Sequence, residues 1–221
     1  MPFSRSGGQY RTMTEIATET IREAIINGDY NSGMRLIPGR LENELKLGRV
    51  AIREALRELS GSGLVVSVPN KGAVVAEAVT LEEMQELFSI RYSLEGKASE
   101  LATTRISEAA LHNLQVLNQD LAGCKSNPRE YFLLNRKFHL DFYKASGWHF
   151  LCHMITLIFD RVLVLRSINP IRAEAIPLFI DAHNQLLQAA IKRNGPLARN
   201  IMVEHLRSGY ESFIDWMQTN R

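Results

Sequence analysis

The hydrophobic and polar positions along the chain follow two different patterns. In the first third, short helical patterns alternate with turn-rich segments and end in the pattern of a β-hairpin. From residue 81 onward, apolar residues recur every three or four positions and strand patterns disappear. The sequence therefore predicts a mainly α-helical protein with two domains, residues 1–78 and residues 79–221, the first of which begins with a flexible arm over residues 1–10.

Two helices are predicted at the start of the first domain. One runs from Thr12 to Gly28, because Thr12 and Glu15 have the spacing of a capping box and Gly28 is suited to end a helix. A turn-rich stretch leads to a short second helix, which we expect to break at Leu47 and Gly48.

The third helix carries basic side chains spaced three, four and four residues apart: Lys46, Arg49, Arg53 and Arg57. On one continuous helix they share a face, with Glu54 as the only acid between them. The neighbouring face is apolar and consists of Ile52, Leu56 and Leu59. The pattern fits a helix that packs on a core and presents charge to a partner, and it also fits a solvated helix with an ion pair.

A hairpin is predicted after the third helix. β-Branched residues flank Pro69, Asn70, Lys71 and Gly72, which suit a four-residue loop built on a type I turn. Three helices followed by a hairpin with a basic tip have the order of a winged helix-turn-helix. In that motif the third helix enters the major groove and the hairpin approaches the adjacent backbone or minor groove.

This region resembles the DNA-binding domain of the GntR family of transcriptional regulators. The resemblance rests on the frame R-x-x-x-REAL-x-x-L from Arg49 to Leu59, followed by GLV and a glycine in the hairpin. It implies that Arg49 and Arg53 contact DNA and that Gly72 lets the hairpin approach it. The residues expected to bind DNA are Arg49, Arg53, Lys46, Arg40, Arg35, Lys71 and Gly72. Arg57 has an alternative role, an ion pair with Glu54 or Glu58.

The chain departs from the family at the start of the third helix. The family usually has Ser-Arg-Thr-Pro where this chain has Gly48, Arg49, Val50 and Ala51, so two hydroxyls that could donate to phosphate are missing. Gly39 also replaces an arginine that is common there. We expect these changes to alter affinity and operator preference rather than the fold.

The second domain is predicted to be an all-α six-helix bundle. The expected helices cover residues 81–104, 107–124, 128–146, 148–168, 172–194 and 196–219. Cys124 and Cys152 lack metal-ligand spacing, no apolar run is long enough to cross a membrane, and the start of the chain lacks the features of a secretion signal. These features predict a cytoplasmic protein without a membrane partner. A net charge of +2 favours no particular partner.

The helical region resembles the FCD ligand-binding domain that accompanies GntR-type DNA-binding domains. Arg91, Leu94, Glu95 and Ala98 match its R-x-x-LE-x-x-A pattern, and six helices rather than seven resemble its shorter, VanR-like branch. The resemblance implies that a divalent metal binds at the centre of the bundle. The ligands would be Asn135, His139, His183 and His205, with asparagine where the family usually has aspartate.

The residue chemistry is compatible with this metal site but does not require it. Three imidazoles and one oxygen, with coordination positions left open, suit zinc, nickel or a similar ion. Asn135 and His139 are four residues apart and share a helix face, but so do His149 and His153, which match nothing in the family. Core or surface histidines therefore remain an alternative. An amide oxygen also stabilises a dication less than a carboxylate does.

The function that these features and the resemblance imply is a homodimeric, ligand-responsive transcription factor, a kind of regulator that in this family is most often a repressor. Two winged helices would read a pseudo-palindrome in double-stranded operator DNA. The bundle would bind a small carboxylate metabolite at or beside the metal, with Arg91 as its partner. Two other functions fit the same features: a metal-dependent, hydrolase-like enzyme with an appended DNA-binding domain, and a dimeric scaffold with a purely structural metal. The enzyme is less favoured, because the sequence offers no convincing general base: Glu204 precedes His205 and on a helix points about 100° away from it.

Overall fold

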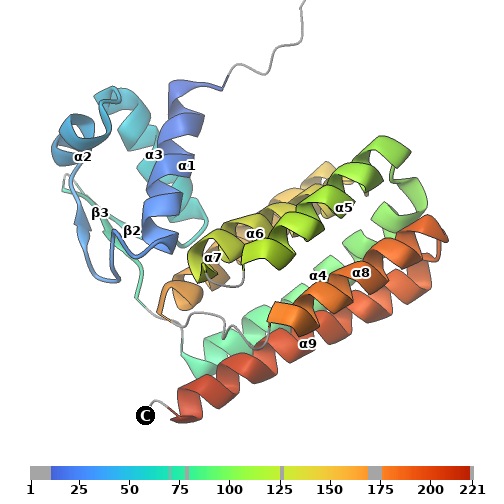
Figure 1. The fold of residues 1–221 in the computed structure, drawn as a ribbon. Helices are drawn as coiled ribbons and strands as arrows, with labels where there is room; N and C mark the ends of the chain where they lie inside the picture. Colours follow the sequence, from blue (N-terminus) through green and yellow to red (C-terminus); the bar gives the residue numbers. More distant parts are fainter. Residues whose placement is uncertain (1–10, 70, 78–79, 125–126, 169–175, 220–221) are drawn as a thin grey trace, which may run out of the picture. The chain divides into compact units, whose positions relative to one another are not determined.

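The computed structural model describes residues 11–69, 71–77, 80–124, 127–168 and 176–219. The chain divides into two compact units, residues 1–77 and residues 78–221, and each is described by itself. The described residues form nine α-helices and three short strands (Figure 1), which confirms the predicted mainly α fold class. The predicted arm over residues 1–10, Asn70 of the hairpin loop and residues 172–175 of the fifth bundle helix lie outside the described residues.

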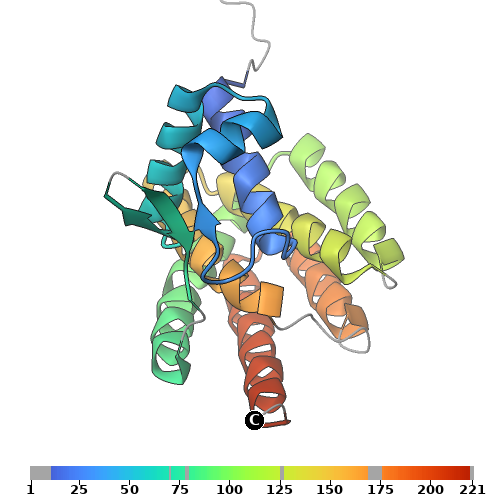
Figure 2. The same cartoon turned by 90° about the vertical axis from the view of Figure 1, so that its left-hand side faces the viewer.

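The first unit combines three helices with a small antiparallel sheet. The helices are α1 (Met13–Ile26), α2 (Pro38–Leu45) and α3 (Arg49–Gly61). The strands are β1 (Arg35–Leu36), β2 (Val65–Val68) and β3 (Gly72–Val75), and β3 lies between the other two (Figure 2). The predicted capping box begins α1: the backbone N–H of Glu15 donates to Oγ1 of Thr12 at 3.1 Å, and the N–H of Thr12 donates to Oε2 of Glu15 at 2.7 Å.

The core of the first unit forms where α1 and α3 pack together. Ile21 and Ile25 of α1 and Ile52 and Leu59 of α3 are at most 1% exposed. Burial of each such side chain contributes about 1.5–3 kcal/mol relative to exposure. The apolar face of α3 is thus committed to the core, and its basic residues lie on the surface.

The sheet differs from the sequence prediction in two respects. The pattern indicated only two strands, but the two-residue strand β1 pairs with β3 through Arg35 opposite Val74 and Leu36 opposite Ala73. Two residues are too few to show an alternating pattern. Gly72 was predicted to lie in the hairpin loop, but it is the first residue of β3 and pairs with Val68.

Gly72 → Ala is expected to destabilise the first unit. Gly72 has a φ of +98°, and a Cβ built on it would lie 2.3 Å from the carbonyl oxygen of Leu36 and 2.8 Å from Cδ of Pro38. Backbone strain of this kind costs about 1–3 kcal/mol before any clash is counted. Thermal unfolding should therefore show a lower midpoint. Gly61 → Ala is the matched control, because its Cβ would meet nothing within 4 Å; equal midpoints for the two variants would contradict this explanation.

The second unit is the predicted six-helix bundle (Figure 1). Its helices are α4 (Leu81–Arg105), α5 (Glu108–Gly123), α6 (Pro128–Lys144), α7 (His149–Ile168), α8 (Ile176–Ile191) and α9 (Gly195–Thr219). Polar side chains at four helix starts accept a backbone N–H of the first turn, as N-caps do: Thr80, Ser107, Asn127 and Asn194. Four large aromatic residues of α6 are completely buried: Tyr131, Phe138, Phe142 and Tyr143.

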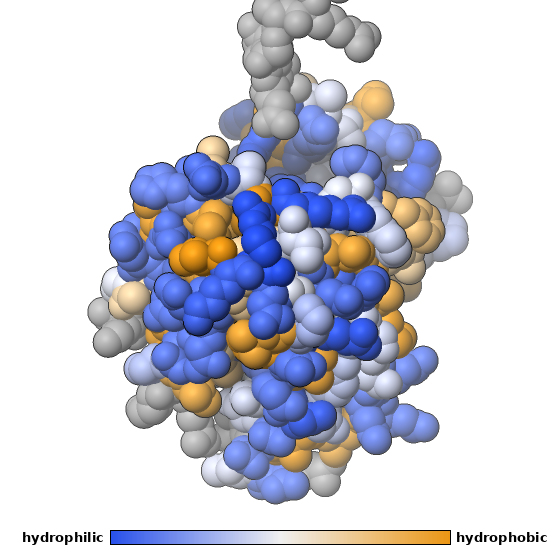
Figure 3. Space-filling model, turned by 90° about the vertical axis from the view of Figure 1, so that its right-hand side faces the viewer, coloured by the Kyte–Doolittle hydropathy of each residue, from blue (hydrophilic) through white to orange (hydrophobic). Residues whose placement is uncertain are grey.

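On the face of the molecule shown in Figure 3, hydrophobic residues form small groups among hydrophilic ones and no extended hydrophobic patch. Among the described residues, no helix combines the length and the apolar character needed to span a membrane.

Candidate DNA-binding surface and metal centre

A groove in the first unit brings basic residues of α3 together with the hairpin. Arg49, Arg53 and Arg57 line it from the helix, and the hairpin contributes Lys71 of its loop and Gly72 at the start of β3. The arginine and lysine side chains are exposed. A positively charged groove between a helix and a hairpin can accept the phosphate backbone while the start of the helix reaches base edges.

Three residues that were predicted to bind DNA do not line this groove: Lys46, Arg40 and Arg35. Arg40 lies on α2 and Arg35 on β1, and both are exposed. Lys46 caps the end of α2 in the left-handed conformation, with φ 56°. The predicted continuous row of four basic residues was therefore wrong in one member, because Lys46 is not on α3.

Arg57 has the ion pair that the sequence allowed. Its Nη1 donates to Oε2 of Glu54 at 3.0 Å, one turn earlier on α3. Such an exposed pair contributes about 0–1 kcal/mol and does not prevent a DNA contact, but it does compete with one.

The start of α3 has no side-chain cap. Gly48 is its N-cap residue and makes no side-chain hydrogen bond. The first backbone N–H groups of the helix, which together carry partial positive charge, thus lack the acceptor that a serine would provide. Such groups can donate to a phosphate instead. Val50, which stands where the family usually has a threonine, is 77% exposed beside Arg49.

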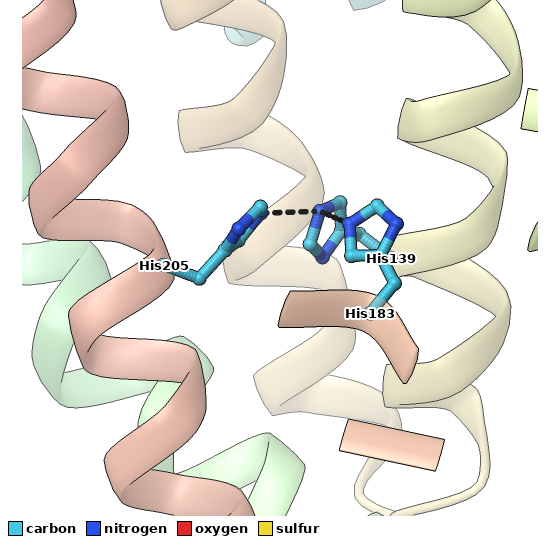
Figure 4. A group of neighbouring side chains, drawn as sticks. All are labelled: His139, His183 and His205. Carbon is cyan, nitrogen blue, oxygen red and sulfur yellow. Dashed lines mark hydrogen bonds between the residues drawn. The ribbon is translucent and has the colours of Figure 1, made fainter. Parts of the chain in front are cut away.

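The second unit contains a cluster of three histidines from three helices (Figure 4). His139 of α6, His183 of α8 and His205 of α9 place ligand atoms within 4.8 Å of one another. Nε2 of His139 lies 3.2 Å from Nε2 of His183 and 3.2 Å from Nε2 of His205. His139 and His183 are 2% and 1% exposed, and His205 is half-buried. The structure thus brings together the three histidines that were predicted from separate segments.

Burial keeps two of the three histidines, His139 and His183, neutral. It holds the pKa of His139 well below the ordinary value, with smaller contributions from His183, His205 and Arg91 in that order. Burial, followed by the neighbouring His205, likewise lowers the pKa of His183. Neutral imidazoles have lone pairs, and a metal requires them.

Hydrogen bonds outside the cluster orient two of the rings. Nδ1 of His183 lies 3.1 Å from Oδ1 of Asn118 on α5, whose Nδ2 donates to Oδ1 of Asn184 at 2.8 Å. Nδ1 of His139 lies 3.2 Å from the hydroxyl of Tyr143. Because Asn118 Oδ1 can only accept, His183 carries its proton on Nδ1 and turns its Nε2 lone pair toward the other histidines.

Asn118 and Tyr143 were not predicted from the sequence. Tyr143 follows His139 by four residues, so helix periodicity could have identified it as a neighbour. Asn118 lies 65 residues before His183 in the sequence, so local patterns carried no signal for this contact.

The predicted fourth ligand, Asn135, lines a small cavity of about 50 Å³ together with His205 and Arg91. Its Oδ1 is buried and has no hydrogen-bond partner among the described residues. A buried amide oxygen without a partner is costly unless something outside the protein occupies its lone pairs. The donor set of three imidazoles and one such oxygen therefore fits a divalent metal.

Arg91, the predicted partner of an acid, lines the same cavity and is 7% exposed. Its Nε donates to Oε1 of Glu95 at 2.6 Å, one turn along α4. The guanidinium carbon lies 4.7 Å from the ring centre of Phe88 and 5.1 Å from that of Phe159. The ion pair with Glu95 uses Nε, and no acceptor among the described residues bonds the two terminal nitrogens.

The second histidine pair of the sequence is separate from the cluster. His149 and His153 lie exposed on α7 and do not belong to the group of possible metal ligands. The spacing of two histidines on a helix therefore did not by itself identify a site.

Two family models match the chain. Residues 14–75 match the DNA-binding region described as "Bacterial regulatory proteins, gntR family", and residues 86–208 match the FCD domain. Together the matches span most of both units.

Two relatives that match most of the chain are bacterial regulators. The HTH-type transcriptional regulator McbR of Escherichia coli K12 is 28% identical over 201 residues, which cover 88% of each chain. The HTH-type transcriptional repressor GlaR of the same strain is 27% identical over 196 residues, covering 84% of this chain and 89% of GlaR.

The solved structure of E. coli McbR/YncC has a similar fold, with a TM-score of 0.83, 24% identity, and coverage of 96% of this chain and 100% of that one. The two matched models show a GntR-type DNA-binding domain joined to an FCD domain. The chain therefore belongs to the GntR family of bacterial transcriptional regulators, and its function is regulation rather than enzymatic catalysis.

Proposed function

We propose that this regulator is a homodimeric repressor that binds operator DNA and is released by a small carboxylate bound near a metal in its helical domain. The observation that carries the proposal is the buried cluster of His139, His183 and His205 beside the cavity that Arg91 lines. Repression is favoured by the relative GlaR, which is named a repressor.

His139, His183, His205 and Asn135 would hold the metal. Three nitrogen ligands and one oxygen favour zinc or nickel over magnesium or calcium, which prefer oxygen ligands throughout. When bound, the metal would supply a positive charge that attracts an anionic ligand into the cavity. The two neutral histidines, His139 and His183, offer their lone pairs without first releasing protons, which favours binding near neutral pH.

The cavity would bind the acid group of the effector. The terminal nitrogens of Arg91 can donate two parallel hydrogen bonds to a carboxylate. The remaining lining is largely apolar and includes Phe88, Phe132, Phe159 and Phe179. Such a lining excludes water and strengthens the charge-assisted contact. To change DNA affinity tenfold, the acid must bind the DNA-released conformation of the protein only about 1.4 kcal/mol more tightly than the DNA-bound conformation. One charge-assisted contact can supply this difference in binding free energy.

The experiment that tests the proposal measures DNA binding with and without small acids. Operator sequences are first selected from a random DNA pool with the zinc-loaded protein, and fluorescence anisotropy then follows their release as acids are added. We expect at least one small acid to weaken binding to the selected DNA. If no acid changes the affinity of the metal-loaded protein, the metal is a structural element of a dimeric scaffold.

Arg91 → Lys is expected to leave DNA affinity without ligand unchanged and to weaken the response to an active acid. Lysine keeps the positive charge beside Glu95 but lacks the planar fork that binds a carboxylate through two hydrogen bonds. Alanine would be a poorer choice, because it would leave the carboxylate of Glu95, which is 1% exposed, without its cation. The measurement is the acid concentration that releases half of the DNA, and an unchanged value would show that the effector does not use Arg91.

A further inference from the structure

We propose that Tyr143 and Glu95 are positioning residues of the metal centre: they hold His139 in the tautomer that presents Nε2 to the metal, and they connect this ligand to Arg91 in the cavity. The inference rests on the metal site proposed above. It concerns two residues whose hydroxyl and carboxylate lie beyond the group of possible ligands, on α6 and α4.

The hydroxyl of Tyr143 has three neighbours. It lies 2.6 Å from Oε2 of Glu95, 3.2 Å from Nδ1 of His139 and 3.2 Å from Sδ of Met202. Tyr143 and Glu95 are at most 1% exposed, so water does not compete for these contacts. Burial and the charge of Glu95 raise the pKa of Tyr143 well above its ordinary value.

The direction of these hydrogen bonds follows from the number of protons. Tyr143 has a single hydroxyl proton, and the carboxylate of Glu95 can only accept. The short contact of 2.6 Å shows that the proton is donated to Glu95, in a charge-assisted bond that is stronger than one to a thioether or a neutral imidazole. The hydroxyl oxygen can then only accept from His139. His139 therefore carries its proton on Nδ1, and its Nε2 has the lone pair that faces His183 and His205.

The same carboxylate connects the metal ligand to the cavity. Glu95 accepts from Tyr143 through Oε2 and from Nε of Arg91 through Oε1, both at 2.6 Å. An acid that binds the terminal nitrogens of Arg91 competes with Glu95 for the guanidinium charge. Glu95 then accepts more strongly from Tyr143, and His139 becomes a better electron donor. By linkage, acid and metal each strengthen the binding of the other.

The test compares zinc affinities, measured by competition with a chromophoric chelator. Tyr143 → Phe removes only the hydroxyl and should weaken zinc binding about 10- to 100-fold, the usual effect of losing a hydrogen bond that orients a metal ligand. Glu95 → Gln should also weaken it. Because Glu95 acts on His139 through the hydroxyl, the double variant should bind zinc no more weakly than Tyr143 → Phe alone.

A second readout uses the metal-free protein. Nitrogen-15 NMR distinguishes the two neutral tautomers of histidine, and we expect the proton of His139 on Nδ1 in the wild type. In Tyr143 → Phe this tautomer loses its acceptor and should no longer predominate. Tyr92 → Phe is the matched control, because Tyr92 packs in the apolar cluster around Phe88 and should change neither readout.

The outcomes separate this inference from the proposed function. If the wild type binds no zinc, the proposed metal site is wrong. If NMR also places the proton of His139 on Nε2 in the wild type, the positioning role is wrong as well. Zinc binding by the wild type with unchanged affinity in Tyr143 → Phe, or an equal loss in Tyr92 → Phe, would overturn the positioning role and leave the metal site standing. Additive losses in the double variant would show that Glu95 does not act through Tyr143.

Discussion

His183 → Ala is expected to abolish the metal binding proposed for the helical domain, together with the stabilisation that a bound metal would provide. His183 supplies one of three converging Nε2 atoms, and its ring is held by Asn118 and stacked on Phe138 at 4.2 Å between ring centres. A ligand present at 100 times its dissociation constant stabilises the folded state by about 2.7 kcal/mol. Metal analysis after dialysis should find near one divalent ion per chain in the wild type and none in the variant.

The unfolding midpoint must also be measured with a chelator, because His183 → Ala removes a buried ring and can lower stability without any loss of metal. Chelation should lower the unfolding midpoint of the wild type and leave that of His183 → Ala unchanged, since the variant has no metal to lose. His153 → Ala, which changes an exposed histidine of α7, should retain both the metal and the response to chelation. Equal metal content in the two variants would show that the ligands were assigned wrongly.

Arg49 → Ala and Arg53 → Ala are each expected to weaken specific DNA binding by about 1–3 kcal/mol, which corresponds to about 5- to 150-fold in affinity. Both side chains are exposed and line the groove between α3 and the hairpin, so their loss should leave thermal stability unchanged. Fluorescence anisotropy with selected operator DNA measures the effect. The affinity of the wild type should also fall steeply with salt, because phosphate contacts release counterions.

Two other basic residues serve as controls for this surface. Lys46 is exposed but does not line the groove, and Arg57 lines it while paired with Glu54. Replacing either by alanine should therefore reduce affinity less than replacing Arg49 or Arg53. If both Arg49 → Ala and Arg53 → Ala bind operator DNA like the wild type, α3 is not the helix that reads the DNA. A loss for Lys46 → Ala as large as that for Arg53 → Ala would extend the interface to the end of α2.

Features set by residues close in sequence were predictable without a structure. The capping box of Thr12 and Glu15 and the apolar face of Ile52 and Leu59 depend on spacings of three to seven residues, which helix geometry converts directly into contacts. The six bundle helices follow from the same periodicity and from the breaks between them. The winged helix-turn-helix followed from the order of these elements, and the family resemblance identified the three histidines among the six in the chain.

Other features depended on how distant segments pack. His139 meets His183 across 44 residues and His205 across 66, so no local spacing could show that their Nε2 atoms converge. The role of Gly72 depends on the carbonyl of Leu36 in a strand too short to predict. Glu95 lies one turn from Arg91 on α4, but its carboxylate also accepts a hydrogen bond from Tyr143 of α6. Local spacing was enough to predict which helix faces are apolar and roughly where most helices begin and end, because those are properties of neighbouring residues. Which polar groups share a buried space depends instead on the packing of all six bundle helices, and no local pattern shows that packing.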